Sequence, residues 1–284
     1  MKMYKEITVK ASPFNPEILS SILWELNLSG LRENDDSLTL YCEQDKEVSL
    51  VSVENLLTRL KTENLITHFE VSEVSFEDKN WNEEWESNID VVEVSEKLVI
   101  KPTFREYDAK PNQIILTIDP KMSFGTGEHQ STKLMLRLME KYISGNESVL
   151  DVGSGTGVLA IAAIKLGSHR ATAIDNNEWC KLNGEENIIL NSVQNEVTVL
   201  LGEISDINEN DFDLVLANIN KNVLIDIVED LYNKTAEDGK LIISGILIID
   251  LQQIIEIYNQ YNFVTLDQLH QDDWAAVIFK KRSR

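Results

Sequence analysis

Short apolar segments alternate with amphipathic segments over the second half of the chain, from residue 130 onward. Apolar residues at helical spacing predict helices at 131–143, 157–167, 178–191, 223–234 and 251–260. Short apolar runs predict strands at 148–153, 171–175, 197–202, 212–219, 239–246, 263–269 and 274–280. This alternation indicates an α/β fold whose parallel sheet carries helices on both faces. The last two strands are joined only by "HQDD", so they must form an antiparallel hairpin at the sheet edge.

The first 76 residues show a different order of elements, which indicates a separate small α+β unit. Strands are expected near Tyr4–Val9, before the turn "NDD", and at 37–43 and 67–76. Helices are expected at 16–27 and 48–64, where leucines and valines recur at helical spacing. The resulting order β-α-β-β-α-β is that of a ferredoxin-like split βαβ sandwich.

Between these two parts lies the segment "EDKNWNEEWESNID" at 77–90, in which Trp81 and Trp85 stand four residues apart. We interpret it as a linker helix whose two indoles dock onto a domain. The sequence therefore predicts three parts, at 1–76, 77–90 and 91–284. Short strands in "DVVEVSEKLVIKP" and "NQIILTID" lead into the third part.

Composition and charge narrow the possible functions. The net charge of −22 would repel a phosphate backbone, so direct nucleic-acid binding is not expected. No run of 18 apolar residues is present and the start forms a strand pattern, so we expect a cytoplasmic protein with no membrane segment. The two cysteines, Cys42 and Cys180, are far apart, which argues against a disulfide or a metal site.

A glycine-rich loop in "VLDVGSGTGVLAIAA" carries the first chemical signal. Gly153, Gly155 and Gly157 lie between an apolar strand and the start of a helix. Ligands of open α/β sheets bind at the carboxyl ends of strands, where glycine lets them approach the backbone. The spacing from Gly155 through Ala160 also matches a dinucleotide motif, so the loop fits either a dinucleotide or S-adenosylmethionine.

Two carboxylates flank this loop. Asp151 precedes it by two residues, where its charge would face the amino group of a methionine moiety and would repel a pyrophosphate. Asp175 ends the next strand, from which it can accept hydrogen bonds from ribose hydroxyls of either cofactor. The terminal antiparallel hairpin is a feature of the class I methyltransferase Rossmann-like sheet and is foreign to dehydrogenases. Together these features favour S-adenosylmethionine and methyl transfer.

The strand at 212–219 ends in Asn218, which is a candidate for positioning the methyl acceptor. A side-chain amide oxygen can hold an acceptor amine by its N–H groups, and positioning supplies most of the acceleration. A lysine acceptor, whose pKa is ordinarily about 10.4, must be desolvated to lose its proton near neutral pH.

The stretches "DPKMSFGTGEHQST", "VLDVGSGTGVLAIAAIKLG", "AIDNN" and "LANI", after "EDKNWNEEWESN", resemble the bacterial ribosomal protein L11 methyltransferase (PrmA) family. The resemblance implies an N-terminal substrate-recognition domain, a helical linker and a C-terminal class I catalytic domain. It also implies S-adenosylmethionine-dependent methylation of lysine side chains of a basic large-subunit ribosomal protein, with an α-amino group as a further acceptor. A basic substrate suits the charge of −22.

The same resemblance assigns site residues. Cofactor contacts would fall on four residues: Thr132, Gly153, Asp175 and Asn218. A segment over the cofactor would comprise Phe124, Gly125, Thr126 and Gly127. We favour a structural role in the loop for His129 over proton relay.

The chain departs from the family pattern in three places. Lys121 stands where a glycine is usual, Gln130 and Ser131 replace Pro-Thr, and "ANIN" replaces "ANIL".

Two other functions remain as alternatives: a nucleotide-dependent oxidoreductase and a non-catalytic S-adenosylmethionine-binding adaptor. The glutamine methyltransferases of release factors are disfavoured, because they carry Asn-Pro-Pro-Tyr where this chain has Asn218-Ile219-Asn220.

Overall fold

The computed structural model describes residues 3–24, 26, 28–43, 48–77, 89–121 and 123–282. The chain divides into two compact units, Met1–Glu84 and Trp85–Arg284, which are considered separately. Most of the expected linker helix, including Trp81 and Trp85, falls outside the described residues. The three boundaries expected from the sequence stay a prediction.

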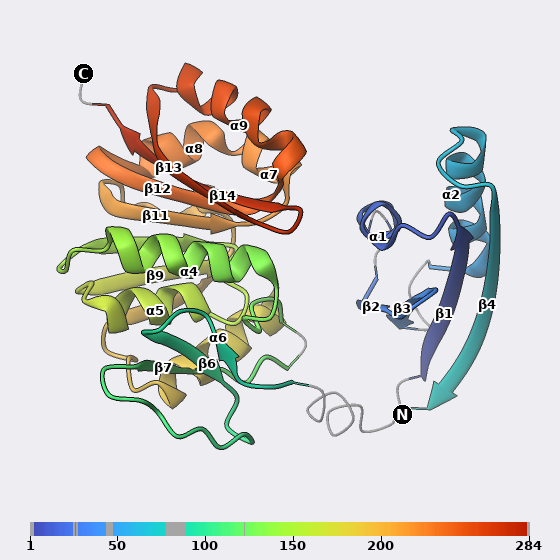
Figure 1. Ribbon diagram of the computed structural model, residues 1–284, viewed down its shortest axis with the longest axis horizontal. Coiled ribbons are helices and arrows are strands. Elements are labelled where there is room, and N and C mark those ends of the chain that lie inside the picture. Colours follow the sequence, from blue (N-terminus) through green and yellow to red (C-terminus); the bar gives the residue numbers. More distant parts are fainter. Residues whose placement is uncertain are drawn as a thin grey trace. The chain divides into compact units, whose positions relative to one another are not determined.

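The first unit is a four-stranded antiparallel sheet with two helices, seen in blue and cyan in Figure 1. Its elements are β1 (Met3–Ser12), α1 (Pro16–Leu23), β2 (Gly30–Glu33), β3 (Leu38–Glu43), α2 (Leu50–Thr62) and β4 (His68–Glu77). The strand order β2-β3-β1-β4 and the element order agree with the expected ferredoxin-like arrangement. Helix α1 ends at Leu23, earlier than the sequence pattern suggests, with Trp24 as its C-cap.

The second unit begins with a small three-stranded sheet of β5 (Val92–Glu93), β6 (Leu98–Lys101) and β7 (Ile114–Thr117). Strand β6 pairs antiparallel with β5 and parallel with β7. The last strand of this sheet, β7, precedes the "FGTG" segment, which spans residues 124–127.

A seven-stranded sheet with the order β10-β9-β8-β11-β12-β14-β13 forms the centre of the second unit. Its strands are β8 (Ser148–Val152), β9 (Arg170–Asp175), β10 (Val197–Leu201), β11 (Phe212–Asn218), β12 (Thr235–Leu247), β13 (Phe263–Gln271) and β14 (Trp274–Lys281). Strands β8 to β12 pair in parallel, and β14 is antiparallel to both β12 and β13. The predicted terminal hairpin is therefore confirmed.

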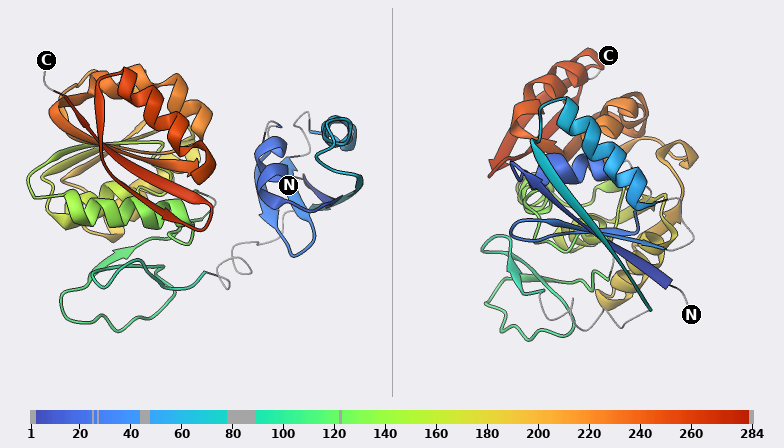
Figure 2. Two further views of the ribbon diagram at one scale, coloured as in Figure 1. Left: turned by 45° about the horizontal axis from the view of Figure 1, so that its top comes forward. Right: turned by 90° about the vertical axis from the view of Figure 1, so that its right-hand side faces the viewer.

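Helices cover both faces of this sheet, as Figure 2 shows for the green and the orange helices. One face carries α4 (Gln130–Tyr142), α5 (Val158–Leu166) and α6 (Glu178–Leu190). The other carries α7 (Lys221–Asp226), α8 (Val228–Lys234) and α9 (Ile248–Gln260). Each face has its own buried apolar core, which is what a sheet with continuously apolar strands requires.

The strand order changes direction between β8 and β11. The chain moves outward from β8 to β9 and β10, then returns to place β11 on the other side of β8. Ligands of open α/β sheets bind at such a switch point, outside the carboxyl ends of the strands. In this unit those ends are Val152 and Asn218.

Two details differ from the sequence-based expectation. The helix expected at 223–234 is two helices, because Ile227 leaves the helical region at φ −100° and ψ 13°. Strand β12 begins at Thr235, four residues before the expected Gly239. Within the part of the chain that is described, no helix has both the length and the apolar character needed to cross a membrane.

Candidate cofactor and acceptor site

The glycine loop joins β8 to α5 at the switch point. Gly153, Gly155 and Gly157 all have positive φ, at 71°, 53° and 77°, a region that glycine enters without a steric penalty. The N–H groups of Gly153 and Ser154 donate to the carbonyl of Ile174 at 2.8 and 3.1 Å. These bonds tie the loop to the end of the neighbouring strand β9.

Asp175, the last residue of β9, holds the next part of this loop. One carboxylate oxygen accepts from the N–H of Gly155 at 2.9 Å, and the other accepts from the N–H of Asn177 at 3.0 Å. Each carboxylate oxygen has a second lone pair, and the side chain is only half-buried. Asp175 can therefore accept hydroxyl donors from a ligand while it shapes the loop.

Asp151 lies fully buried inside β8, beneath the loop. Its Oδ2 accepts from the N–H of Ala160 at 3.1 Å, in the first turn of α5. Its Oδ1 is buried and has no hydrogen-bond partner among the described residues. Burial, together with a smaller effect of the charge of Asp175, raises the pKa of Asp151 to about 7, although the N–H of Ala160 acts in the opposite direction. An unpaired buried carboxylate oxygen is costly, so the position suits a ligand that brings a hydrogen-bond donor or a positive charge.

The "FGTG" segment rests directly on the glycine loop. The carbonyl of Phe124 accepts from the N–H of Thr156 at 2.9 Å, and the carbonyl of Gly125 accepts from the Thr156 hydroxyl at 2.9 Å. A Cβ at Gly155 would lie 2.3 Å from the Phe124 oxygen, and one at Gly125 would lie 2.6 Å from the Thr156 hydroxyl. These glycines are needed because two backbone segments meet here without room for side chains.

The other two residues of the "FGTG" segment, Thr126 and Gly127, make contacts outside the glycine loop. Thr126 accepts from the N–H of Glu128 at 3.2 Å and so stabilises its own turn. A Cβ at Gly127 would lie 2.3 Å from the terminal carbon of Ile100 in β6. Gly127 therefore packs against the three-stranded sheet, and this close contact explains why the position has no side chain.

Asn218 and Thr132 meet across 86 residues of sequence. The side-chain nitrogen of Asn218 donates to the hydroxyl of Thr132 at 3.4 Å. The amide oxygen of Asn218 is buried and unpaired within the ranges that the structure describes. The next residue, Ile219, packs against Gly153, where a Cβ would lie 2.3 Å from its Cγ2 carbon. The structure thus brings Thr132, Gly153 and Asn218 to one place at the switch point.

His129 occupies the N-cap of α4. Its Nδ1 accepts from the N–H of Ser131 at 3.2 Å. Its ring makes edge contacts with Phe124 and Trp274, at centroid distances of 5.3 and 4.5 Å. Burial, and then the charge of Lys133, lowers the pKa of His129, so the ring is neutral at pH 7. These contacts favour the structural role expected for His129.

Sequence reasoning missed several residues of this site. Thr156 joins the two loops, and the hydroxyl of Ser154 is buried without a partner in the described part of the chain. Trp274 reaches His129 from the start of β14, which no local sequence signal indicates. Three asparagines of α6, discussed below, form a regular series that could have been noticed from their spacing of four.

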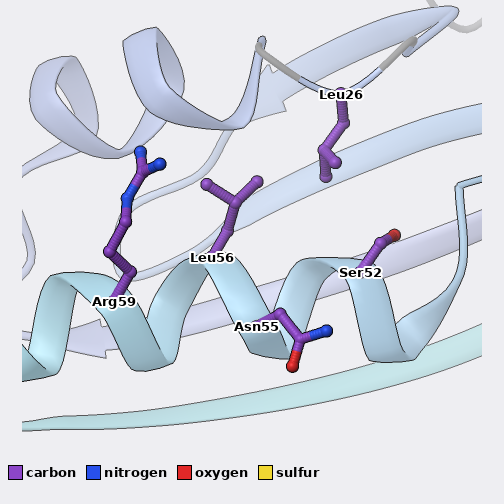
Figure 3. Close-up of a pocket in the computed structure, with 5 residues that line it drawn as sticks. All are labelled: Leu26, Ser52, Asn55, Leu56 and Arg59. Atoms are coloured by element: carbon purple, nitrogen blue, oxygen red, sulfur yellow. The ribbon is translucent and has the colours of Figure 1, made fainter.

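A hollow of about 350 Å³ lies in the first unit (Figure 3). It is lined by Leu26, Ser52, Asn55, Leu56 and Arg59. Figure 3 shows four of these side chains on α2 and Leu26 opposite them. None of the predicted site residues is among them.

The residues at the switch point fit S-adenosylmethionine. Its α-amino group is the donor that the unpaired oxygen of Asp151 lacks, and its ribose hydroxyls suit Asp175. The buried carboxylate of Asp151 beneath the loop would oppose a pyrophosphate there.

The family model described as "Ribosomal protein L11 methyltransferase (PrmA)" matches residues 5–282, which includes both units. A protein of Chlorobaculum tepidum named ribosomal protein L11 methyltransferase is 35% identical over 276 residues, covering 94% of this chain and 93% of the relative. A protein of the same name from Desulfotalea psychrophila is 29% identical over 299 residues, covering 99% of both chains.

A solved structure is also similar. The crystal structure of a ribosomal protein L11 methylase from Lactobacillus delbrueckii subsp. bulgaricus superposes with a TM-score of 0.64 at 30% identity. The match covers 68% of this chain and 100% of that one.

Proposed function

The chain belongs to the ribosomal protein L11 methyltransferase (PrmA) family, and on that premise we propose that it methylates amino groups of ribosomal protein L11. S-adenosylmethionine is the methyl donor, and the fold is that of class I methyltransferases. The preferred acceptors are lysine side chains, with the α-amino group as a further acceptor. The reaction takes place in the cytoplasm, and it needs no direct contact with nucleic acid.

The observation that carries the proposal is the unpaired amide oxygen of Asn218 at the carboxyl end of β11. Thr132 engages the nitrogen of the same amide, so the oxygen is the end left to a ligand. An amide oxygen in this position accepts an N–H from an acceptor amine and orients the nitrogen lone pair. Positioning of this kind can supply a large part of the rate enhancement.

Cofactor binding is assigned to the glycine loop and its two carboxylates. Asp175 would hold the ribose hydroxyls, and the free oxygen of Asp151 would hold the amino group. Gly153 and Gly155 keep the loop free of side chains, and Phe124 to Gly127 border it. The bound cofactor supplies a methyl group on a positively charged sulfur.

The acceptor must be neutral when it attacks. A lysine entering a water-poor site loses part of its solvation, which lowers its pKa and favours the free amine. Asn218 offers an uncharged acceptor, so it holds the amine without stabilising its protonated form as a carboxylate would. As the new nitrogen–carbon bond forms, the sulfur–carbon bond breaks, and the proton already released goes to solvent.

An acidic rim, defined as Glu128, Asp272 and Asp273, supports a basic substrate. All three side chains are exposed. Glu128 and Asp273 directly precede His129 and Trp274, whose rings are in contact, and Asp272 accepts from Gln130 at 3.1 Å. A cationic lysine segment would be attracted to this rim before it enters the site. The domain expected at 1–76 would recognise the rest of the substrate.

The decisive experiment measures transfer of labelled methyl from S-adenosylmethionine to purified ribosomal protein L11, with the modified residues identified by mass spectrometry. Asn218→Ala should reduce the rate at least a hundredfold while the variant remains folded. Asn220→Ala is the matched control, because Asn220 is exposed and, within the described residues, does not cap α7 with its side chain. Its rate should stay within threefold of the parent. Methyl groups found only on amide or carboxyl side chains would contradict the proposed acceptor.

A further inference from the structure

Three asparagines follow one another at intervals of four residues along α6 and its C-terminal cap: Asn183 and Asn187 in the helix, and Asn191 as its C-cap. All three are buried, and Asn187 is completely inaccessible. Buried amides in a helix require partners, because an unpaired buried polar group costs on the order of 1–3 kcal/mol. Most of their partners lie in the segment at the end of β7 and just after it, at Thr117 and Asp119, although Asn191 also donates to the carbonyl of Asn187 within the helix at 2.8 Å.

Asn191 and Asn187 pair with this segment as a neighbouring strand would. Asn191 accepts from the N–H of Thr117 at 2.9 Å and donates to its carbonyl at 2.6 Å. Asn187 accepts from the N–H of Asp119 at 2.9 Å and donates to its carbonyl at 3.3 Å. Asn183 donates to the same Asp119 carbonyl at 2.8 Å. Alternate residues of the segment are thus bound by successive turns of α6.

Asn187 differs from the other two because it also binds the glycine loop. Its side-chain nitrogen donates to the carbonyl of Thr156 at 3.0 Å. Thr156 is the residue whose N–H and hydroxyl hold Phe124 and Gly125. One amide group therefore connects both backbone segments that border the proposed cofactor site.

We propose that Asn187 is a positioning residue for cofactor binding, which sets the distance between the glycine loop and the segment leading to Phe124. This inference rests on the proposed binding of S-adenosylmethionine at that loop. Asn187 does not need to touch the ligand. Its two donated hydrogens fix Asp119 and Thr156 relative to each other, so the site is formed before the cofactor arrives.

The test compares Asn187→Leu with Asn191→Leu. Both remove a buried amide of α6 and its bonds to the same segment, but only the first removes a bond to the glycine loop. Calorimetry should give a dissociation constant for S-adenosylmethionine at least tenfold higher for Asn187→Leu and within threefold of the parent for Asn191→Leu. In assays, the KM for the cofactor should rise while the KM for the protein substrate stays unchanged.

Hydrogen exchange of the cofactor-free protein provides a readout that does not depend on the proposed function. The Thr156 N–H should exchange at least tenfold faster in Asn187→Leu and at the parent rate in Asn191→Leu. If the leucine variants do not fold, Asn187→Ser and Asn191→Ser repeat the comparison at lower temperature. Equal losses of affinity and equal exchange rates for the two positions would overturn the positioning role. A parent protein that binds no S-adenosylmethionine would refute the proposed function, and the exchange rates would still decide the role of Asn187.

Discussion

The side-chain nitrogen of Asn218 lies 3.4 Å from the hydroxyl oxygen of Thr132, so the end of β11 is joined to the first turn of α4. This bond occupies the nitrogen of the Asn218 amide and leaves its buried oxygen without a partner among the described residues. It links two of the residues expected to bind the cofactor. It also supplies a hydrogen-bond partner for the buried hydroxyl of Thr132.

Replacement of Thr132 by valine tests this link. Valine keeps the shape of the side chain but removes the hydroxyl, so the Asn218 amide loses its fixed orientation. We expect kcat/KM to fall about tenfold, which corresponds to about 1.4 kcal/mol, the size of one hydrogen bond. Thr132→Ser keeps the hydroxyl and should retain most of the activity. Equal activity for the valine and serine variants would show that the orientation of the amide is not controlled by Thr132.

The buried carboxyl of Asp151 should make the stability of the free protein fall with rising pH. Burial raises the pKa of Asp151 from 3.8 to about 7, so the folded chain retains a proton that the unfolded chain has released. The free energy of unfolding contributed by this group therefore decreases between about pH 4 and pH 7. Asp151→Asn removes the effect and should raise the free energy of unfolding at pH 8 by on the order of 2–4 kcal/mol, measured in urea.

Asp213 is a control of opposite sign. Burial raises its pKa, but the N–H and hydroxyl of Ser148 outweigh burial and lower it overall. Its contribution is present above the unfolded pKa and is lost as pH falls, so Asp213→Asn should destabilise the protein at pH 8. Stabilisation by both substitutions would contradict the assignment of an ionisation cost to Asp151.

The same carboxyl should make cofactor affinity depend on pH in the opposite direction. A ligand that brings an ammonium group beside Asp151 favours the ionised carboxylate. The affinity for S-adenosylmethionine should therefore rise as pH increases from 6 to 8, with proton release detectable by calorimetry in buffers of different ionisation enthalpy. Asp151→Asn should bind at least tenfold more weakly at pH 8 and lose this pH dependence. An unchanged pH profile in the variant would rule out the amino-group contact.

Comparison of Gly155→Ala with Gly145→Ala should separate the loss of stability caused by positive φ from the loss of cofactor affinity caused by a clash at the site. Gly155 and Gly145 both have positive φ, so alanine at either position costs about 1 kcal/mol or more of stability. A Cβ at Gly155 would lie 2.3 Å from the backbone oxygen of Phe124, which is a clash, whereas one at Gly145 would lie 3.9 Å from the backbone oxygen of Gly167, which is an ordinary contact. We expect Gly155→Ala to lose at least tenfold in cofactor affinity and Gly145→Ala to lose none, as measured by calorimetry.

Lys121 is a position where substitution should stabilise the protein. It has φ of +46°, a conformation in which a non-glycine residue pays about 1 kcal/mol. Its exposed ion pair with Glu186 contributes little in return. Lys121→Gly should therefore raise the free energy of unfolding by about 0.5 kcal/mol. Glu186→Gln removes the ion pair alone, and a loss above about 1 kcal/mol in that variant would contradict this balance.

The main architecture could be predicted from the sequence because its signals are local. Apolar strands buried on both faces are recognisable without knowledge of their neighbours, and the short turn before Trp274 requires an antiparallel hairpin. The break at Ile227 was not predicted, because the apolar spacing continues through it and only the backbone changes direction.

The site was only partly predictable for the same reason. Gly153, Asp175 and Asn218 follow directly from the rule that ligands bind at the carboxyl ends of strands. The contacts of Asn187 reach residues 31 and 68 positions away, and a polar residue in a helix ordinarily indicates a solvated face. Long-range pairing of this kind has no signature in a single sequence. The contributions of individual residues to cofactor binding stay predictions.

The position of β14 has a consequence for synthesis of the protein. Strand β14 lies between β12 and β13, and it delivers Trp274 to the ring of His129. A nascent polypeptide released before this strand is made would leave β12 with an open edge and the "FGTG" segment without its aromatic neighbour. Competence for methylation therefore requires the insertion of β14, so termination before this strand should yield an inert and aggregation-prone product.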